Sequence, residues 1–124
     1  MQYLLMCYFD EKAWARIPQA QRDEVMHDYG AFVHDTTTSG HYLAGGKLQS
    51  SSTATAVRAT NGKPVVSDGP FAETKEQLGG YHLVECNDLD EALALAKRIP
   101  TLRVGGTVEV RPLERNLHGH GAGA

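Results

Sequence analysis

Charged residues gather in one short stretch of the sequence, Ser67 to Glu85, which reads SDGPFAETKEQLGGYHLVE. Asp68 and Lys75 lie within it, shortly before an apolar segment. Charge-rich loops that lead into a buried strand often hold functional groups on a rigid base. A carboxylate and an ammonium beside an apolar sheet can act as acid and base if burial shifts their pKa values. Asp68 and Lys75 are therefore catalytic candidates. The structural alternative is that Asp68 closes its own turn and Lys75 pairs with Glu73 or Glu76 on the surface.

Two predicted strands add polar side chains to this set. Tyr81 and His82 are adjacent in the first, so they point to opposite faces of the sheet. His82 is the polar member, and we expect it to face an open cleft as a catalytic candidate; a structural histidine is the alternative. Glu109 and Arg111 alternate with valines in the second strand. If the valines contact the helices, this charged pair faces the same cleft as candidate substrate-binding residues, and mutual pairing offsets part of its burial.

A predicted helix from Gln19 to about Ser39 carries the remaining candidates. Its apolar side chains recur at three- and four-residue spacing, which is typical of an amphipathic helix. Tyr29 lies on the apolar stripe, where its hydroxyl needs a polar partner. His27 and His34 are seven residues apart and share a face, either as functional groups or as a solvated flank. We take Tyr29 and His27 as candidate substrate-binding residues.

Other kinds of site find little support in the sequence. His118 and His120 belong to a Gly- and His-rich tail, and no fixed set of metal ligands is visible. Gly45-Gly46-Lys47 lacks the surrounding pattern of a phosphate-binding loop. No Gly-x-Ser-x-Gly elbow for a nucleophilic serine is present. We therefore expect neither a metal nor a cofactor. Trp14 either lines the mouth of a pocket or packs at the domain edge.

Length and composition are those of one ordinary globular domain. The chain has 124 residues, 41% hydrophobic and 22% charged. We expect a single domain over residues 1–113 and a flexible tail over residues 114–124. The formal net charge of −3 argues against binding to nucleic acid.

Nothing in the sequence indicates a membrane or an export route. No apolar run reaches about eighteen residues, the length that a spanning helix needs. The apolar start lacks the basic residues and the cleavage site of a signal peptide. Cys7 and Cys86 each lie in an apolar run, so we interpret them as buried thiols, with redox or metal roles as the alternative. We expect a cytoplasmic protein.

The order of predicted elements is strand, helix, strand, hairpin, strand, helix, strand. Tyr3 to Phe9 is apolar throughout, which is typical of a strand buried on both faces. Asn61-Gly62 predicts a hairpin turn, Ala72 to Leu78 a short helical turn and Tyr81 to Glu85 a strand. This order predicts an α+β ferredoxin-like sandwich with both helices on one face. The other face then needs cover, which suggests a homodimer.

Several motifs together resemble a known family. DGPFAETKEQLGGY, the later VEVRPL, the opening MQYLLMCYFDEKAW and a first helix containing YGAF are similar to the YCII-related family, in its DGPF-motif branch. The resemblance extends to about Leu113. It implies a dimeric α/β barrel, in which two ferredoxin-like protomers pack sheet against sheet with a cleft between them.

The resemblance also implies candidate functions, although most members have no assigned activity. Some relatives carry a His–Asp pair proposed as catalytic, and its Asp matches Asp68. Its His falls near His27 to Tyr29, and alignment on the following glycine places Asp28 or Tyr29 there. One related group is similar to muconolactone-isomerase-type enzymes, including a chlorolactone dehydrochlorinase. The first hypothesis is therefore a cofactor-free homodimer that binds a small organic molecule and catalyses lactone isomerisation or elimination.

The second hypothesis is a protein without catalytic activity. Genes of the DGPF branch often neighbour those of extracytoplasmic-function sigma factors. The resemblance thus also implies an accessory or regulatory protein in a stress response. Such a protein is expected to have an exposed apolar patch away from the dimer face and no wet cleft.

Overall fold

The computed structural model describes residues 1–114. Of the tail expected to be flexible, residues 115–124 lie outside the described residues. The strands and helices are β1 (Gln2–Phe9), α1 (Glu11–Arg16), α2 (Gln19–Thr38), β2 (Tyr42–Lys47), β3 (Thr55–Thr60), β4 (Lys63–Asp68), β5 (Gln77–Glu85), α3 (Leu89–Ala96) and β6 (Thr107–Pro112). Two short 3₁₀ helices complete the described elements, η1 (Ser51–Thr53) and η2 (Pro100–Val104).

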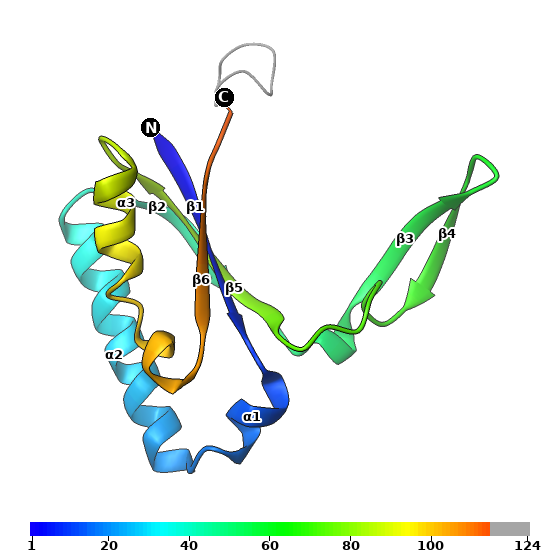
Figure 1. Ribbon diagram of the computed structural model, residues 1–124, viewed down its shortest axis with the longest axis horizontal. Coiled ribbons are helices and arrows are strands. Elements are labelled where there is room, and N and C mark those ends of the chain that lie inside the picture. Colours follow the sequence, from blue (N-terminus) through cyan, green and yellow to red (C-terminus); the bar gives the residue numbers. More distant parts are fainter. Residues whose placement is uncertain (115–124) are drawn as a thin grey trace.

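The main sheet has four antiparallel strands in the order β2-β5-β1-β6. The helices α2 and α3 both cover one face of it (Figure 1). This arrangement is the predicted ferredoxin-like α+β sandwich, with β1 in a central position. No helix among the described residues is long and apolar enough to cross a membrane.

Strand β1 separates the two faces of the sheet. Tyr3, Leu5 and Cys7 are buried against the helices, whereas Leu4 and Met6 point the other way and are only half-buried. The apolar run predicted burial on both faces, but the chain itself covers only one. The uncovered face, called the open face below, presents Leu4, Met6, Tyr8, Leu78, Tyr81, Leu83, Glu109 and Arg111, as the strand pairing shows.

Local signals explain where the helices begin and end. Helix α2 starts directly after Pro18 and buries Val25, Phe32 and Thr36. It ends before Gly40, whose φ of 83° suits a residue without a side chain. Asp88 caps the start of helix α3, because its carboxylate accepts a hydrogen bond from the Glu91 backbone N–H at 2.9 Å.

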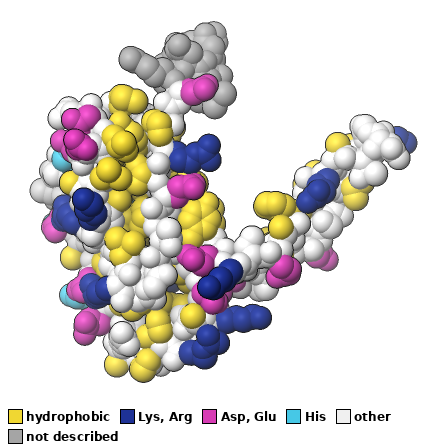
Figure 2. Space-filling view, in the orientation of Figure 1, with side chains coloured by type: hydrophobic (Ala, Val, Ile, Leu, Met, Phe, Trp, Pro, Cys, Tyr) yellow, Lys and Arg dark blue, Asp and Glu magenta, His cyan; other side chains and the backbone are white. Residues whose placement is uncertain are grey.

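The hairpin β3–β4 forms a separate two-stranded sheet, called the arm below. Figure 1 shows that it projects away from the main sheet and the helices. Asn61 and Gly62 both have positive φ, 51° and 80°, which confirms the predicted Asn-Gly turn. Hydrophobic side chains lie uncovered on the arm (Figure 2), among them Val57 and Val66, each 65% exposed.

The segment between the arm and β5 differs from the prediction. The prediction of a helical turn at Ala72 to Leu78 is wrong, because residues 69–76 form bends and irregular chain. Strand β5 begins at Gln77 and includes the glycine pair expected to precede it. Gly80 pairs with Cys7 on one side and Lys47 on the other, where a Cβ would lie 2.9 Å from the Gly46 carbonyl oxygen. The missing side chains therefore let three strands approach closely.

Candidate functional site

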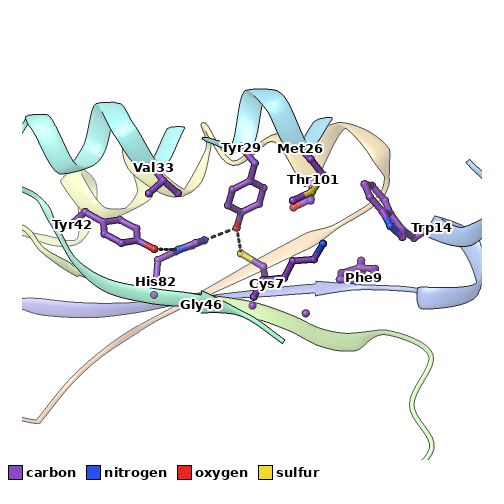
Figure 3. A pocket seen from close by; sticks show the side chains of 14 residues that line it. Cys7, Phe9, Trp14, Met26, Tyr29, Val33, Tyr42, Gly46, His82 and Thr101 are labelled. Atoms are coloured by element: carbon purple, nitrogen blue, oxygen red, sulfur yellow. Dashed lines mark hydrogen bonds between the residues drawn. The ribbon is translucent and has the colours of Figure 1, made fainter. Parts of the chain in front are cut away.

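His82 is held between two tyrosine hydroxyls on the helix-covered face of the sheet. Its Nδ1 lies 2.7 Å from the Tyr42 hydroxyl, and its Nε2 forms a hydrogen bond with the Tyr29 hydroxyl. The Tyr29 hydroxyl also lies 3.2 Å from the Cys7 Sγ. Figure 3 shows Tyr29 descending from α2 toward His82 and Cys7 on the sheet. The four side chains form one continuous chain of hydrogen bonds.

The structure corrects the prediction of the sheet face on which His82 lies. We expected His82 in an open cleft, but it pairs with the fully buried Leu5 and is itself only 4% exposed. Tyr81 takes the open face instead and is 38% exposed. The polar character of His82 misled the prediction, because Tyr29 and Tyr42 satisfy both ring nitrogens inside the protein.

Gly45 makes room for the Tyr42–His82 hydrogen bond. It pairs with His82 across the sheet. A Cβ built on Gly45 would overlap the Tyr42 hydroxyl and lie 2.9 Å from His82 Nδ1. The same Cβ would lie 2.7 Å from the Tyr81 backbone carbonyl oxygen, so both backbone and side chains approach Gly45 closely.

Burial keeps this hydrogen-bonded chain neutral. It lowers the pKa of His82 to about 4, because the charged imidazolium is poorly solvated there. Burial also raises the pKa of Tyr29, with a further contribution from its hydrogen bond to Cys7. The pKa of the Cys7 thiol is raised by burial as well. Near neutral pH the imidazole, the phenols and the thiol are therefore all uncharged.

A neutral imidazole donates at one ring nitrogen and accepts at the other. If Tyr42 donates to Nδ1, then Nε2 donates to Tyr29, and Tyr29 donates to the Cys7 sulfur. In the opposite tautomer every donor and acceptor in the chain is reversed. The geometry thus accommodates two tautomers of His82 that differ only in the direction of the chain.

These residues line a cavity of about 230 Å³ between α2 and the sheet (Figure 3). Apolar and aromatic side chains form most of its wall, and the rings of Phe9 and Trp14 lie 6.0 Å apart. The lining comprises Cys7, Phe9, Trp14, Met26, Tyr29, Val33, Tyr42, Gly45, Gly46, Lys47, Gly79, Gly80, His82 and Thr101. Apolar cavities with a few convergent polar groups are typical ligand sites.

Most of the other predicted site residues lie elsewhere. Asp68 is the last residue of β4 and is exposed on the arm. Lys75 is exposed in the segment before β5. His27 is exposed on α2 and does not line the cavity. Of the residues proposed for the site, the structure brings together only Tyr29 and His82.

Glu109 and Arg111 lie on the open face, as predicted from their alternation with valines. Val108 and Val110 pack against the core, so the charged side chains point away from the helices. Both are exposed. Their predicted role in binding a substrate stays a prediction.

Sequence reasoning missed several residues of the cavity. Tyr42 was not singled out from the sequence, Cys7 was interpreted as a buried thiol, and Lys47 was considered only within an incomplete phosphate-loop pattern; all three line the cavity. Trp14 lines the cavity, which was one of the two alternatives considered for it. The unsatisfied hydroxyl expected for Tyr29 was the one signal that pointed here. No cluster of three or more metal-binding side chains occurs among residues 1–114.

The fold places this chain among small ferredoxin-like α+β proteins, here with a cavity between α2 and the sheet. Residues 1–115 match the model of the YCII-related domain, and the chain belongs to this family. It is 37% identical over 114 residues to an uncharacterised protein of Rhizobium meliloti (strain 1021), covering 91% of this chain and 92% of that protein.

A solved structure supports the same fold. The chain is similar to 5-chloro-2-hydroxyhydroquinone dehydrochlorinase from Burkholderia phenoliruptrix AC1100, determined in complex with 2,5-dihydroxybenzoquinone. The match covers 95% of this chain and 98% of that chain, with a TM-score of 0.55 and 14% sequence identity. At this identity the likeness establishes the ferredoxin-like fold.

Proposed function

We propose that the protein binds a small single-ring organic molecule in this cavity and moves protons on it by general acid/base catalysis. The observation that carries the proposal is the neutral imidazole of His82, held at both nitrogens by tyrosine hydroxyls beside an apolar cavity. The cavity measures about 230 Å³. An apolar cavity of about 150 Å³ in another protein holds one benzene ring, so one substituted ring fits here.

The proposed proton transfer passes through the hydrogen-bonded chain. Tyr29 donates its hydroxyl proton to the bound molecule, and its oxygen takes the proton from Nε2 of His82. Nδ1 of His82 then takes the proton of Tyr42, which recovers one from solvent because Tyr42 is only half-buried. In the opposite direction, Tyr29 accepts a proton from the bound molecule and each transfer is reversed.

This chain explains why a histidine with a low pKa is useful. The imidazole switches tautomer without becoming an imidazolium, so no net charge has to be carried in the buried part of the site. A histidine that worked as a charged acid would need a pKa near the working pH. At a pKa of about 4, His82 is suited to relaying protons as a neutral group.

Isomerisation of a small lactone and elimination of a halide are the reactions we propose first. Both require one carbon-bound proton to be removed and another group to leave or be protonated. The structural likeness to a dehydrochlorinase supports this reaction class. The Asp68–Phe71 turn, which reads DGPF, supports placement in the DGPF-motif branch of the family.

Solvent exchange of carbon-bound hydrogen tests the proposal. The protein is incubated in D₂O with 2,5-dihydroxybenzoquinone or a small unsaturated lactone, and loss of the C–H signal is followed by NMR. We expect exchange faster than in buffer, slowed about 100-fold in Tyr29→Phe, which is the low end of general acid/base contributions. Asp68→Asn is the control and should exchange at the wild-type rate.

Trp14 shows whether the probe is bound during this experiment. It is the one tryptophan of the chain and lines the cavity, so its fluorescence reports occupancy. A probe that changes Trp14 fluorescence but exchanges at the buffer rate would contradict acid/base catalysis on that molecule. It would leave the protein as a binding protein.

We also propose that the protein is a homodimer joined through the open face. Leu4, Met6, Tyr8, Leu78, Tyr81 and Leu83 form an uncovered apolar surface on that face. Monomeric proteins rarely leave such a surface in water, and a second copy supplies a matching one. The proposed dimer leaves the His82 cavity on the outer, helix-covered side of each protomer.

The arm supports the second candidate, an accessory or regulatory protein that acts through protein contacts. Val57, Val65, Val66 and Phe71 are between 48% and 75% exposed on or beside it. An isolated two-stranded hairpin is only marginally stable in water, which favours a partner. Copurification with a sigma factor that is lost in Val66→Asp, but kept in Tyr29→Phe, would favour this candidate over catalysis.

A further inference from the structure

Lys47 is the one charged residue that lines the cavity within the described part of the chain. It pairs with Gly80 across the sheet, whereas Gly45, two residues earlier, pairs with His82. Side chains two residues apart in a strand share a face. The Lys47 side chain therefore lies on the same side of the sheet as His82 and the cavity.

The residues that neighbour Lys47 in the sheet leave space around its amine. Gly80 lies between Lys47 and Cys7 and has no side chain to separate them. Lys47 is exposed and also lines the cavity, so it lies where the cavity opens to solvent. None of the ion pairs among residues 1–114 involves it.

The charge of the lining is therefore positive. Burial keeps His82, Tyr29 and Cys7 neutral at pH 7, and no Asp or Glu belongs to the lining within residues 1–114. An ammonium beside an apolar cavity attracts an anion more strongly than it would in open water. Charge-assisted hydrogen bonds to an ionised oxygen are about twice as strong as neutral ones.

We propose that the cavity selects a single-ring organic anion, whose ionised oxygen binds Lys47 while the ring faces Tyr29. The oxygen belongs to a carboxylate or to an ionised enol or phenol. This inference rests on the proposed function, because it names the class of molecule bound at the same site. Lys47 would also stabilise negative charge that develops on a ring oxygen as Tyr29 removes a proton.

A pair of probes with the same ring tests the inference. 2,5-Dihydroxybenzoquinone is ionised at neutral pH, and its dimethyl ether has the same ring without the acidic groups. Calorimetric titration of wild type should show roughly 10-fold tighter binding of the anion, the ratio expected for about 1.4 kcal/mol. Lys47→Met should bind both probes equally, Lys47→Arg should restore much of the preference, and Lys63→Met, on the arm, should leave it unchanged.

The possible failures are distinguishable. If wild type binds both probes with equal affinity, or Lys47→Met keeps the preference, the role of Lys47 is overturned and the proposed function stands. If neither probe binds wild type, both the inference and the single-ring function are overturned. Unchanged circular dichroism of Lys47→Met establishes that a lost preference is not a lost fold.

Discussion

The two faces of the main sheet carry different groups, although the same strands supply both. On the helix-covered face, His82 is buried between tyrosine hydroxyls and its pKa falls to about 4. On the open face, Glu109 and Arg111 are exposed beside apolar side chains. One strand, β5, contributes His82 to the first face and Tyr81 to the second.

This difference is the reason for proposing a reactive site on only one of the two faces. In the single protomer, the charged side chains on the open face are exposed to solvent, which screens their interactions. Within residues 1–114, the cavity on the covered face is lined by a single cation, Lys47, and by several neutral polar groups whose pKa values are altered by burial. We therefore propose proton transfer on the covered face and assembly through the open face.

Gly45→Ala should have the largest effect, and only on the covered face. The added Cβ overlaps the Tyr42 hydroxyl and crowds His82 Nδ1. We expect a loss of about 3 kcal/mol in the free energy of unfolding, the upper part of the range for overpacking, and no ligand binding. Urea denaturation and calorimetric titration measure the two effects.

Gly30→Ala is the matched control for this substitution. Gly30 lies in α2, and a Cβ there would have nothing within 4 Å. Alanine is the better helix former by about 1 kcal/mol, so this variant should be slightly more stable and should bind ligand normally. Equal destabilisation by both substitutions would show that the close approach at Gly45 has no special role.

Met6→Asp should affect the open face alone. Met6 lies on the central strand β1, with its side chain on the uncovered surface. A carboxylate buried without a partner in the proposed dimer should raise its dissociation constant at least about 100-fold. Sedimentation velocity measures this, with Val57→Asp on the arm as control. A monomeric wild type, or an unchanged dimer in Met6→Asp, would refute the open-face dimer.

The pH dependence of stability should report the buried imidazole. The pKa of His82 is about 4 in the folded protein and about 6.5 in an unfolded chain, so the unfolded state binds more protons between these values. The contribution is complete above pH 6.5 and is lost as the pH falls toward 4, on the order of 3 kcal/mol. The contribution of His82 is the difference between the urea midpoints of wild type and His82→Gln at each pH, because all other groups titrate in both proteins. If the urea midpoints of both proteins changed with pH in the same way, the low pKa of His82 would be contradicted.

Asp68→Asn should have the smallest effect in this account. Asp68 is exposed on the arm, and exposed substitutions usually change stability by less than about 0.5 kcal/mol. Ligand affinity and exchange rate should therefore remain near the wild-type values. A large loss of activity would restore the catalytic role predicted from the sequence and would require the arm to reach a site during catalysis.

Much of the fold could be predicted from the sequence because its signals are local. The Asn61-Gly62 turn, the apolar spacing along α2 and the apolar run of β1 each depend on neighbouring residues. The extension of β5 through its glycine pair could not be predicted. It depends on pairing with two other strands, which no local pattern reveals.

The site was harder to predict because it is made of long-range contacts. Tyr42 and His82 are forty residues apart, and Tyr29 and His82 fifty-three. Tyr29 could be predicted because its hydroxyl lies on an apolar stripe of the helix and therefore needs a polar partner. The orientation of His82 was missed because its partners were unknown, and Asp68 was favoured because charges close in sequence attract notice even when they lie on the surface.

Nitrogen-resolved NMR of the His82 ring tests the central claim most directly. The ring signals are followed from pH 3 to 8, first alone and then with 2,5-dihydroxybenzoquinone. We expect His82 to titrate near pH 4, and the probe to shift its signals but not those of the exposed His27 and His34. A titration near the ordinary value of about 6.5, with no shift at His82 on binding, would contradict the account.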